Sequence, residues 1–295
     1  MTELQLSSRI EELLVARNPR HMQAARAALQ PGYYLRAAQV LRDIAGHVII
    51  GTGFPVAATF ETDGPLGAIA LYQTLQYLGA RPLLACGAPL AQVLRADYAV
   101  LELSARDAAT AARRARDHLQ ALQPAAVLCI ERPGLAEDGR YYNMRGQDIS
   151  EHCACFDPYI TLASCPTIAV GDGGNEIGMG NIADAIAALD IRRSVTRCDE
   201  LLVADVSNWG AYGLIAFLAY WRRSDLLARL APLAILDYLC DKGSVDGVTG
   251  QNTPTEDGLE ATEGLAVIRE LRRLTGFVAD SAAATGHGID TGNDV

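Results

Sequence analysis

Residues 167–181 read TIAVGDGGNEIGMGN, and the interpretation of the whole chain starts from this stretch. Its residues 168–170 form a short apolar run that is typical of a buried parallel strand. The chain then enters a glycine-rich loop, after which we expect a helix over residues 182–189. In open α/β folds such a loop lies at the carboxyl edge of the sheet, where ligands bind. The stretch therefore predicts an α/β fold with a ligand site at this edge.

Three polar side chains lie between the glycines of this loop: Asp172, Asn175 and Glu176. Two carboxylates and one amide so close together suit a divalent cation or an amine better than a bare phosphate. The loop has no GxxxxGK[ST] pattern, and Glu176 stands where the dinucleotide motif requires glycine. We therefore expect no nucleotide or organic cofactor. The simpler alternative is a glycine-rich connection whose Asp or Asn only caps the next helix.

The composition indicates a globular protein with a full hydrophobic core. The chain has 295 residues, of which 50% are hydrophobic, and a formal net charge of −10 at pH 7. This acidic balance, without any basic run, argues against a nucleic-acid partner. No apolar run approaches the roughly 18 residues that span a bilayer, and no export or organelle signal is visible. The seven scattered cysteines are typical of free thiols, so a cytoplasmic protein without a membrane partner is expected.

Alternating strands and helices predict a mostly parallel sheet flanked by helices, with glycine-rich loops at the carboxyl ends of the strands. A helical segment over residues 1–46 precedes this α/β domain; it offers no visible chemistry and would serve as a lead-in or a homo-oligomer contact. The domain itself is expected over residues 47–280, as one body or two lobes, with a flexible tail over 281–295. Strands are expected over residues 47–50, 82–86, 99–103, 125–130, 168–170 and 201–204, and later helices over 211–221, 222–240 and 260–274.

Polar clusters also follow three other predicted strands. Asp63 comes after the first strand, Glu131 and Arg132 follow the strand over 125–130, and Ser207-Asn208 follows the strand over 201–204. Since parallel strands end at one edge of a sheet, these clusters should lie near the central loop. The planar guanidinium of arginine suits a carboxylate partner. The simpler alternatives are a solvated loop after Glu131 and an N-cap at Ser207 or Asn208.

Five separated blocks resemble the D-glutamate cyclase family. The first is ETDGPLGA in residues 61–68, which follows a GTGFP loop, and the others are CIER in residues 129–132, DGRYYN in residues 138–143, GDGGNEIGMGN in residues 171–181 and VSNWG in residues 206–210. The resemblance implies a lyase that cyclises D-glutamate to 5-oxo-D-proline with loss of water, and hence an acidic amino acid as substrate.

Such a reaction needs a neutral amine, a polarised carboxyl group, a proton carrier and a clamp on the second carboxylate. We expect Mg²⁺ or Mn²⁺ to be held by Asp63, Asp172, Asn175 and Glu176. The expected proton-transfer and catalytic residues are Glu176, Asp172 and Glu131. The expected substrate-binding residues are Arg132, Arg145, Tyr142, Asn143, Gly173, Gly174, Ser207 and Asn208. Without a metal, the acids would bind the substrate ammonium, and Arg132 or the glycine N–H groups would polarise the carboxyl group.

Two other functions are compatible with these residues. One is a metal-dependent hydrolase or lyase that acts on another small carboxylated or phosphorylated molecule. The other is a non-catalytic protein whose glycine loops bind a small ligand without turnover.

Overall fold

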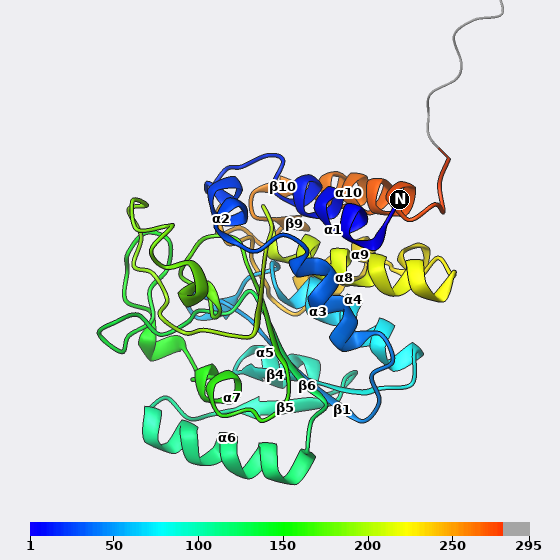
Figure 1. The fold of residues 1–295 in the computed structure, drawn as a ribbon. Coiled ribbons are helices and arrows are strands. Elements are labelled where there is room, and N and C mark those ends of the chain that lie inside the picture. Colours follow the sequence, from blue (N-terminus) through cyan, green and yellow to red (C-terminus); the bar gives the residue numbers. More distant parts are fainter. Residues whose placement is uncertain (280–295) are drawn as a thin grey trace, which may run out of the picture.

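A six-stranded parallel sheet forms the core of the computed structural model, which describes residues 1–279 (Figure 1). The expected tail over residues 281–295 lies outside the described residues. Neighbouring strands are parallel at every pairing, which confirms the predicted α/β class. The sheet runs in the order β5 (Val100–Leu103), β4 (Arg81–Gly87), β1 (His47–Thr52), β6 (Ala126–Ile130), β7 (Thr167–Gly171) and β8 (Glu200–Val203).

The strand order reverses between β1 and β6, in the middle of the sheet. The chain first builds outward from β1 to β4 and β5, and then crosses back to build β6, β7 and β8 on the other side. Thr52 at the end of β1 lies opposite Ile130 at the end of β6. Loops that leave these two strands diverge, which opens a crevice at the carboxyl edge of open α/β sheets. The residues after Thr52 and Ile130 are therefore placed to form a ligand site.

Helices cover both faces of the sheet. On one face α3 (Tyr33–Leu41), α4 (Pro65–Tyr77) and α8 (Ser207–Arg222) pack together, and on the other α6 (Ala108–Leu122) contacts α7 (Asp157–Thr161). The shorter elements are α2 (Met22–Ala28), α5 (Leu90–Leu94), the hairpin of β2 (Pro55–Val56) with β3 (Thr59–Phe60), and that of β9 (Thr255–Glu256) with β10 (Leu259–Glu260).

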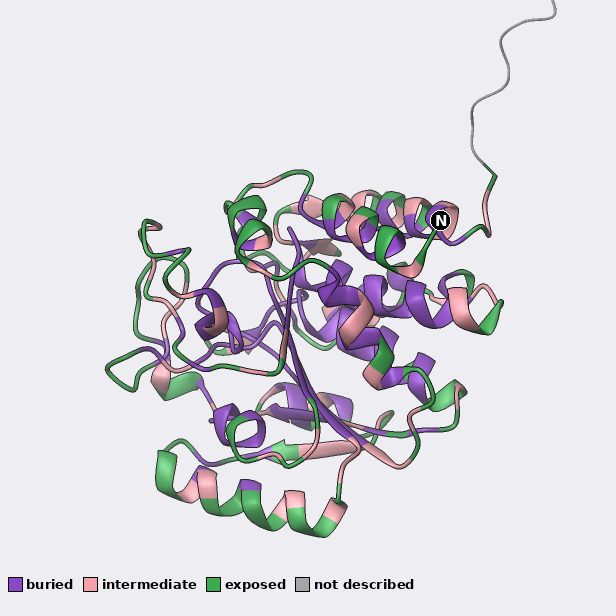
Figure 2. Cartoon of the chain, in the orientation of Figure 1, coloured by how far each residue is buried: buried purple, intermediate pink, exposed green. Residues whose placement is uncertain are grey.

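A second helical layer covers α8. It consists of α1 (Glu3–Leu14) and α10 (Ala261–Leu274), which lie beside each other in Figure 1, and α9 (Pro232–Asp241) packs against α10 and α4. Residues 207–219 of α8 are all buried, as the colouring of Figure 2 shows. A helix that is apolar on all sides is stable only when other elements enclose it, so the N-terminal helices complete the core.

Two predicted helices differ from the structure. Residues 182–189 form no α-helix, because a short 3₁₀ helix at Met179–Ile182 gives way to turns whose hydrogen bonds mostly span three residues. Arg193 donates to the carbonyl of Ala183, and Thr196 accepts from Gly178 N and Gly180 N, so tertiary contacts override local helix propensity. The helix predicted over 222–240 is interrupted, since α8 ends at Arg222 and α9 begins only at Pro232.

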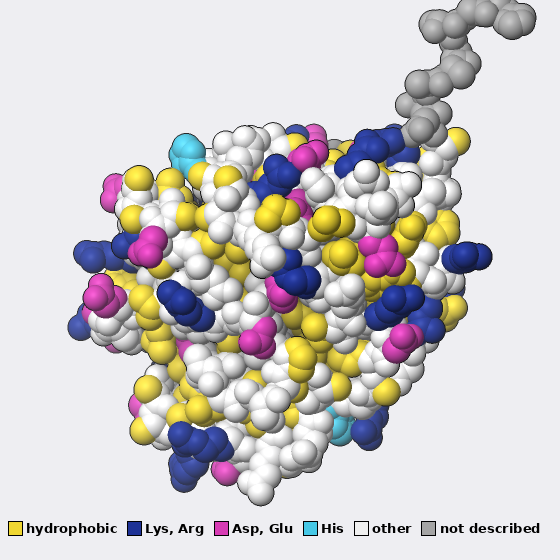
Figure 3. All heavy atoms as spheres, viewed as in Figure 1, with side chains coloured by type: hydrophobic (Ala, Val, Ile, Leu, Met, Phe, Trp, Pro, Cys, Tyr) yellow, Lys and Arg dark blue, Asp and Glu magenta, His cyan; other side chains and the backbone are white. Residues whose placement is uncertain are grey.

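The surface mixes charges of both signs. On the face shown in Figure 3, basic and acidic side chains alternate with apolar ones. Within residues 1–279 no helix combines the length and apolarity that crossing a membrane demands. All seven cysteines are free, as predicted.

Candidate active site

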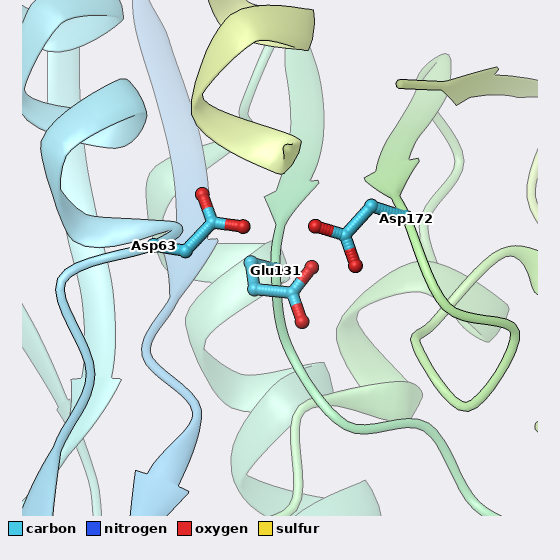
Figure 4. A group of neighbouring side chains, drawn as sticks. All are labelled: Asp63, Glu131 and Asp172. Atoms are coloured by element: carbon cyan, nitrogen blue, oxygen red, sulfur yellow. The ribbon is translucent and has the colours of Figure 1, made fainter. Parts of the chain in front are cut away.

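Three carboxylates from distant parts of the sequence meet at the switch point of the sheet. Asp63 precedes α4, Glu131 follows β6, and Asp172 follows β7. Their carboxylate groups point toward one another (Figure 4), and one oxygen from each lies within 4.8 Å of the others. All three are buried, with at most 6% of the residue surface exposed. Glu131 also has a φ of 45°, a strained conformation for a residue with a side chain, and such strain is concentrated at functional sites.

The N-terminus of α8 holds this cluster in place. Asp63 accepts hydrogen bonds from Ser207 N (3.0 Å) and Asn208 N (2.8 Å), and Asp172 accepts from Ser207 N (3.1 Å). The hydroxyl of Ser207 donates to Glu131 at 2.5 Å. Free N–H groups and the helix dipole both favour negative charge at this end of a helix. Ser207 and Asn208, which were predicted as substrate-binding residues, lie at this cluster and bind protein carboxylates there.

Asn208 connects the cluster to the next layer of residues. Its Oδ1 accepts from Gly64 N (2.9 Å) and Gly67 N (2.7 Å), while its Nδ2 donates to Glu256 at 3.0 Å. These bonds join the first turns of α4 and α8. Asn208 therefore positions Asp63 through the backbone of both helices.

A cation that the sequence did not suggest lies in the cluster. Arg20, in the link between α1 and α2, places Nη2 2.8 Å from Asp172 Oδ2 and also pairs with Asp257. Its Nε donates to the carbonyl of Asp172 at 3.0 Å. Residues 1–46, in which the sequence showed no chemistry, therefore contribute a charged side chain to the cluster. Within residues 1–279, Arg20 makes the only ion pair with the buried acids of the site.

Negative charge exceeds positive charge around the cluster, and the pKa values of its three carboxyl groups are raised, mainly by burial. Burial, and then the charge of Asp257, raises the pKa of Asp63 to about 6. Burial, and then Glu176, raises the pKa of Glu131 well above its ordinary value. The pKa of Asp172 is also raised, since burial outweighs the opposing charge of Arg20. The site therefore holds more carboxylates than its own cation neutralises.

The glycine loop brings Glu176 to the same region. Residue 176 forms a bridge to Pro133, directly after Glu131 and Arg132, and Glu176 is 1% exposed. Gly174 N donates to Glu176 Oε2 at 2.7 Å, so this N–H group is occupied by the protein itself. Burial raises the pKa of Glu176, although the hydrogen bond from Gly174 opposes the rise. Asn175 lies beside it, with Nδ2 donating to the carbonyl of Tyr142 at 2.8 Å.

Arg132 is buried but points its guanidinium at backbone carbonyls. Nη1 donates to the carbonyls of Thr52 (3.0 Å) and Gly53 (3.1 Å), and Nη2 donates to that of Ala154. Its Nε is buried without a hydrogen-bond partner in the described residues. Arg132 also lines a shallow cleft beside the ends of β1 and β4. The guanidinium of Arg132 therefore connects backbone segments at the edge of the sheet, and its Nε–H is the one donor group without a partner among the described residues.

Three other expected substrate-binding residues lie outside the cluster. The hydroxyl of Tyr142 donates to Asp138 at 2.6 Å, and Asn143 closes its own turn by accepting from Arg145 N at 3.0 Å. The side chain of Arg145 is exposed and donates to the carbonyl of Val248 at 3.2 Å. These residues shape the outer surface of the loop that follows β6.

Four acidic or basic residues of the site escaped the sequence interpretation. Glu61 and Glu256 are buried beside Asp63, and Asp257 joins Arg20 to the cluster. Glu61 stands two residues before Asp63 in the same polar block, which was a usable signal. No sequence signal pointed to Arg20, because it lies in a short link within a helical segment and reaches the site only through tertiary packing.

The donor set fits a divalent cation. Hard cations prefer carboxylate oxygens, and the three carboxylates of Asp63, Glu131 and Asp172 converge from separate elements on one point. Among the described residues only Arg20 forms an ion pair with this group of three carboxylates, so a divalent cation would balance the remaining negative charge. Asp63 and Asp172 were predicted as metal ligands, whereas Glu131 was predicted only as a catalytic acid or base. Asn175 and Glu176 lie outside this group of three.

Comparison with known proteins gives two matches. A family model described as "D-glutamate cyclase-like, C-terminal" matches residues 10–272, a range that includes Arg20 and the whole cluster. The human protein named "D-glutamate cyclase, mitochondrial" is 32% identical over 201 residues, which cover 59% of this chain and 33% of the human protein. The chain therefore matches about a third of the length of this curated relative.

Proposed function

The chain belongs to the D-glutamate cyclase-like family, and we propose that it is a lyase that cyclises D-glutamate to 5-oxo-D-proline with release of water. The observation that carries the proposal is the buried cluster of Asp63, Glu131 and Asp172 at the carboxyl edge of the sheet. A site with this surplus of carboxylates requires cationic partners. A divalent cation and the ammonium group of an amino acid are two partners that the reaction itself would bring.

Asp63, Glu131 and Asp172 would hold the divalent cation, Mg²⁺ or Mn²⁺. When bound, such a cation supplies Lewis acidity toward a carboxyl oxygen of the substrate. Around it, α8 keeps the three carboxylates in place through Ser207 and the backbone N–H of Asn208. The ligands are thereby oriented before any substrate arrives, which lowers the reorganisation cost of the reaction.

The proton balance of the reaction requires a residue that carries protons from the ammonium group to the leaving oxygen. The substrate nitrogen forms a bond to the γ-carboxyl carbon, one C–O bond breaks, and two protons of the ammonium group end on the oxygen that leaves as water. Glu176 lies beside Glu131 and is buried, so it is placed to take a proton from the ammonium and return it to the leaving oxygen. Its Oε2 is held by Gly174 N, which fixes the direction of the carboxylate.

The test is NMR observation of the purified full chain with D-glutamate, L-glutamate or D-glutamine, in EDTA and with added Mn²⁺ or Mg²⁺. We expect 5-oxoproline from D-glutamate, with turnover lost in EDTA and restored by the cation. The isosteric variant Glu176→Gln should lose turnover and keep its fold, whereas Glu137→Gln, an exposed acid, should behave as the wild type. Absence of 5-oxoproline from folded, metal-supplemented wild type would rule out the proposed reaction. Turnover that persists in EDTA would support the proposed reaction and contradict the requirement for a metal ion.

A further inference from the structure

The loop after β7 contains a buried acceptor group that nothing in the fold uses. Oδ1 of Asn175 has no hydrogen-bond partner in the described residues, although Asn175 is only 2% exposed. Its other amide atom, Nδ2, donates a hydrogen bond to the carbonyl of Tyr142. An acceptor that is buried and unpaired costs free energy, so proteins normally supply it with a donor. No described residue supplies that donor, and a bound ligand would supply it.

The surroundings of this oxygen define the ligand. A methyl group built on Gly173 would lie 3.0 Å from Asn175 Oδ1, 2.8 Å from Glu176 Oε1 and 2.6 Å from Met144 Sδ. The amide oxygen, the carboxylate oxygen and the Met144 sulfur thus converge on the same side of Gly173, so closely that a side chain at position 173 would require one of them to move. Both oxygens are hydrogen-bond acceptors, and the thioether is a weak one. A ligand group that satisfies both oxygens is a hydrogen-bond donor, and a positively charged donor also pairs with the charge of an ionised Glu176.

Met144 separates this space from solvent. It belongs to the loop that follows β6, and 36% of its surface is exposed although its sulfur reaches Gly173. A methionine side chain is flexible and adapts to neighbouring groups at low cost. A ligand that reaches the cradle formed by Gly173, Asn175 and Glu176 would therefore displace the side chain of Met144.

We propose that Asn175 Oδ1 and Glu176 form the subsite that binds the ammonium group of the substrate, over Gly173 and beneath Met144. The proposal rests on the proposed function and assigns Asn175 a different partner from the metal ion that its residue type first suggested. An amide oxygen with one carboxylate suits an ammonium group, which donates several hydrogen bonds. The three converging carboxylates suit a hard divalent cation better. The two cations of the reaction thereby occupy neighbouring but separate places.

The test compares D-glutamate with glutarate, which has both carboxylates and no amine. Both ligands are titrated calorimetrically into the full chain with Mn²⁺ present, for the wild type, Asn175→Ala and Asn175→Asp. Asn175→Asp keeps an acceptor at this position and removes the donor to Tyr142. The matched control is Asn181→Ala in the same loop, because both ends of the Asn181 amide are paired with Cys198.

We expect Asn175→Ala to weaken D-glutamate about tenfold or more, the usual effect of a lost hydrogen bond to a charged group, and to change glutarate less than twofold. Asn175→Asp should bind D-glutamate within about threefold of the wild type, since it keeps the acceptor. In the turnover assay, Asn175→Ala should lower kcat/KM mainly by raising KM. Asn181→Ala should leave the ratio of the two ligand affinities unchanged.

Three results would overturn the inference: equal weakening of both ligands in Asn175→Ala, a parallel loss of Mn²⁺ affinity, or no binding of D-glutamate by the folded wild type. The failure of the proposed function is distinguishable from these. If the wild type binds D-glutamate without forming 5-oxoproline, and Asn175→Ala removes its preference over glutarate, the amine subsite stands and the cyclase reaction does not.

Discussion

Nη2 of Arg20 lies 2.8 Å from Oδ2 of Asp172, although 152 residues separate the two in the chain. The contact joins a link between two N-terminal helices to the first residue of the loop after β7. Burial lowers the pKa of Arg20, but the charges of Asp172 and Asp257 outweigh it and raise the pKa well above its ordinary value. The guanidinium is therefore a permanent positive charge in a site of excess carboxylates.

Replacing Arg20 tests the role of this charge. In metal-free protein we expect Arg20→Met to lower the free energy of unfolding at pH 8 by about 3 kcal/mol, because Asp172 would remain buried without its cation. The loss should be smaller at pH 5, where protons neutralise the carboxylates. Urea denaturation at both pH values measures it. The control Arg17→Ala removes an exposed ion pair with Glu263 and should cost less than about 1 kcal/mol. Equal losses in the two variants would contradict the prediction.

The stability of the metal-free protein should fall as the pH rises from about 4 to about 8. Burial raises the pKa of Asp63 from 3.8 to about 6 and that of Glu256 from 4.5 to about 8. A carboxyl group with a higher pKa in the folded state binds its proton more tightly there, so protonation stabilises the fold. That contribution is complete below the unfolded pKa and is lost as the pH rises through the folded pKa.

The variant Glu256→Gln isolates one part of this pH dependence. Its amide has no titrating proton and can still accept a hydrogen bond from Asn208 Nδ2. We expect the decline of the unfolding free energy between pH 5 and pH 8 to become shallower, by at most about 1.4 kcal/mol per pH unit. Denaturation midpoints across this range measure the slope. A slope unchanged from that of the wild type would show that Glu256 is ionised throughout.

Removing one carboxylate of the cluster should weaken metal binding. We expect Glu131→Gln to lower the affinity for Mn²⁺ by at least about tenfold, because the amide keeps the shape of the side chain and lacks its charge. Titration followed by electron paramagnetic resonance reports free Mn²⁺ directly. The exposed loop acid Asp138 serves as the control, since Asp138→Asn should bind Mn²⁺ as the wild type does. Wild-type affinity in Glu131→Gln would place the metal elsewhere.

A single methyl group should close the proposed amine subsite. In Gly173→Ala the new Cβ would contact Glu176 Oε1 and Asn175 Oδ1 at 3.0 Å or less, so we expect kcat/KM for D-glutamate to fall by at least about tenfold with a stability cost of about 1–3 kcal/mol. Gly87→Ala, where a Cβ would meet Ala154 at 3.0 Å, is the matched control for crowding outside the carboxylate cluster. Full activity in Gly173→Ala would show that the space over Gly173 is not used by the substrate.

Strand positions and the edge of the sheet that carries the site were predictable from the sequence. Short apolar runs followed by glycine and polar residues predicted the parallel strands, and parallel strands necessarily end at one edge. Asp63, Glu131 and Asp172 were therefore expected near one another, and the structure brings them together. The helix over residues 182–189 was wrong because hydrogen bonds from the returning chain, such as Arg193 to Ala183, outweigh the local preference of that segment.

The sequence by itself determined the fold class, the sheet edge that carries the polar loops, and the residue types of the candidate site, because hydrophobic periodicity and glycine placement act over a few neighbouring residues. Only the tertiary structure decided which side chains meet. It placed Arg20 among the acids, turned Arg132 toward backbone carbonyls, and left Asn175 Oδ1 without a partner. The direction of a side chain depends on contacts with residues far away in the chain, and local sequence patterns carry no information about those contacts.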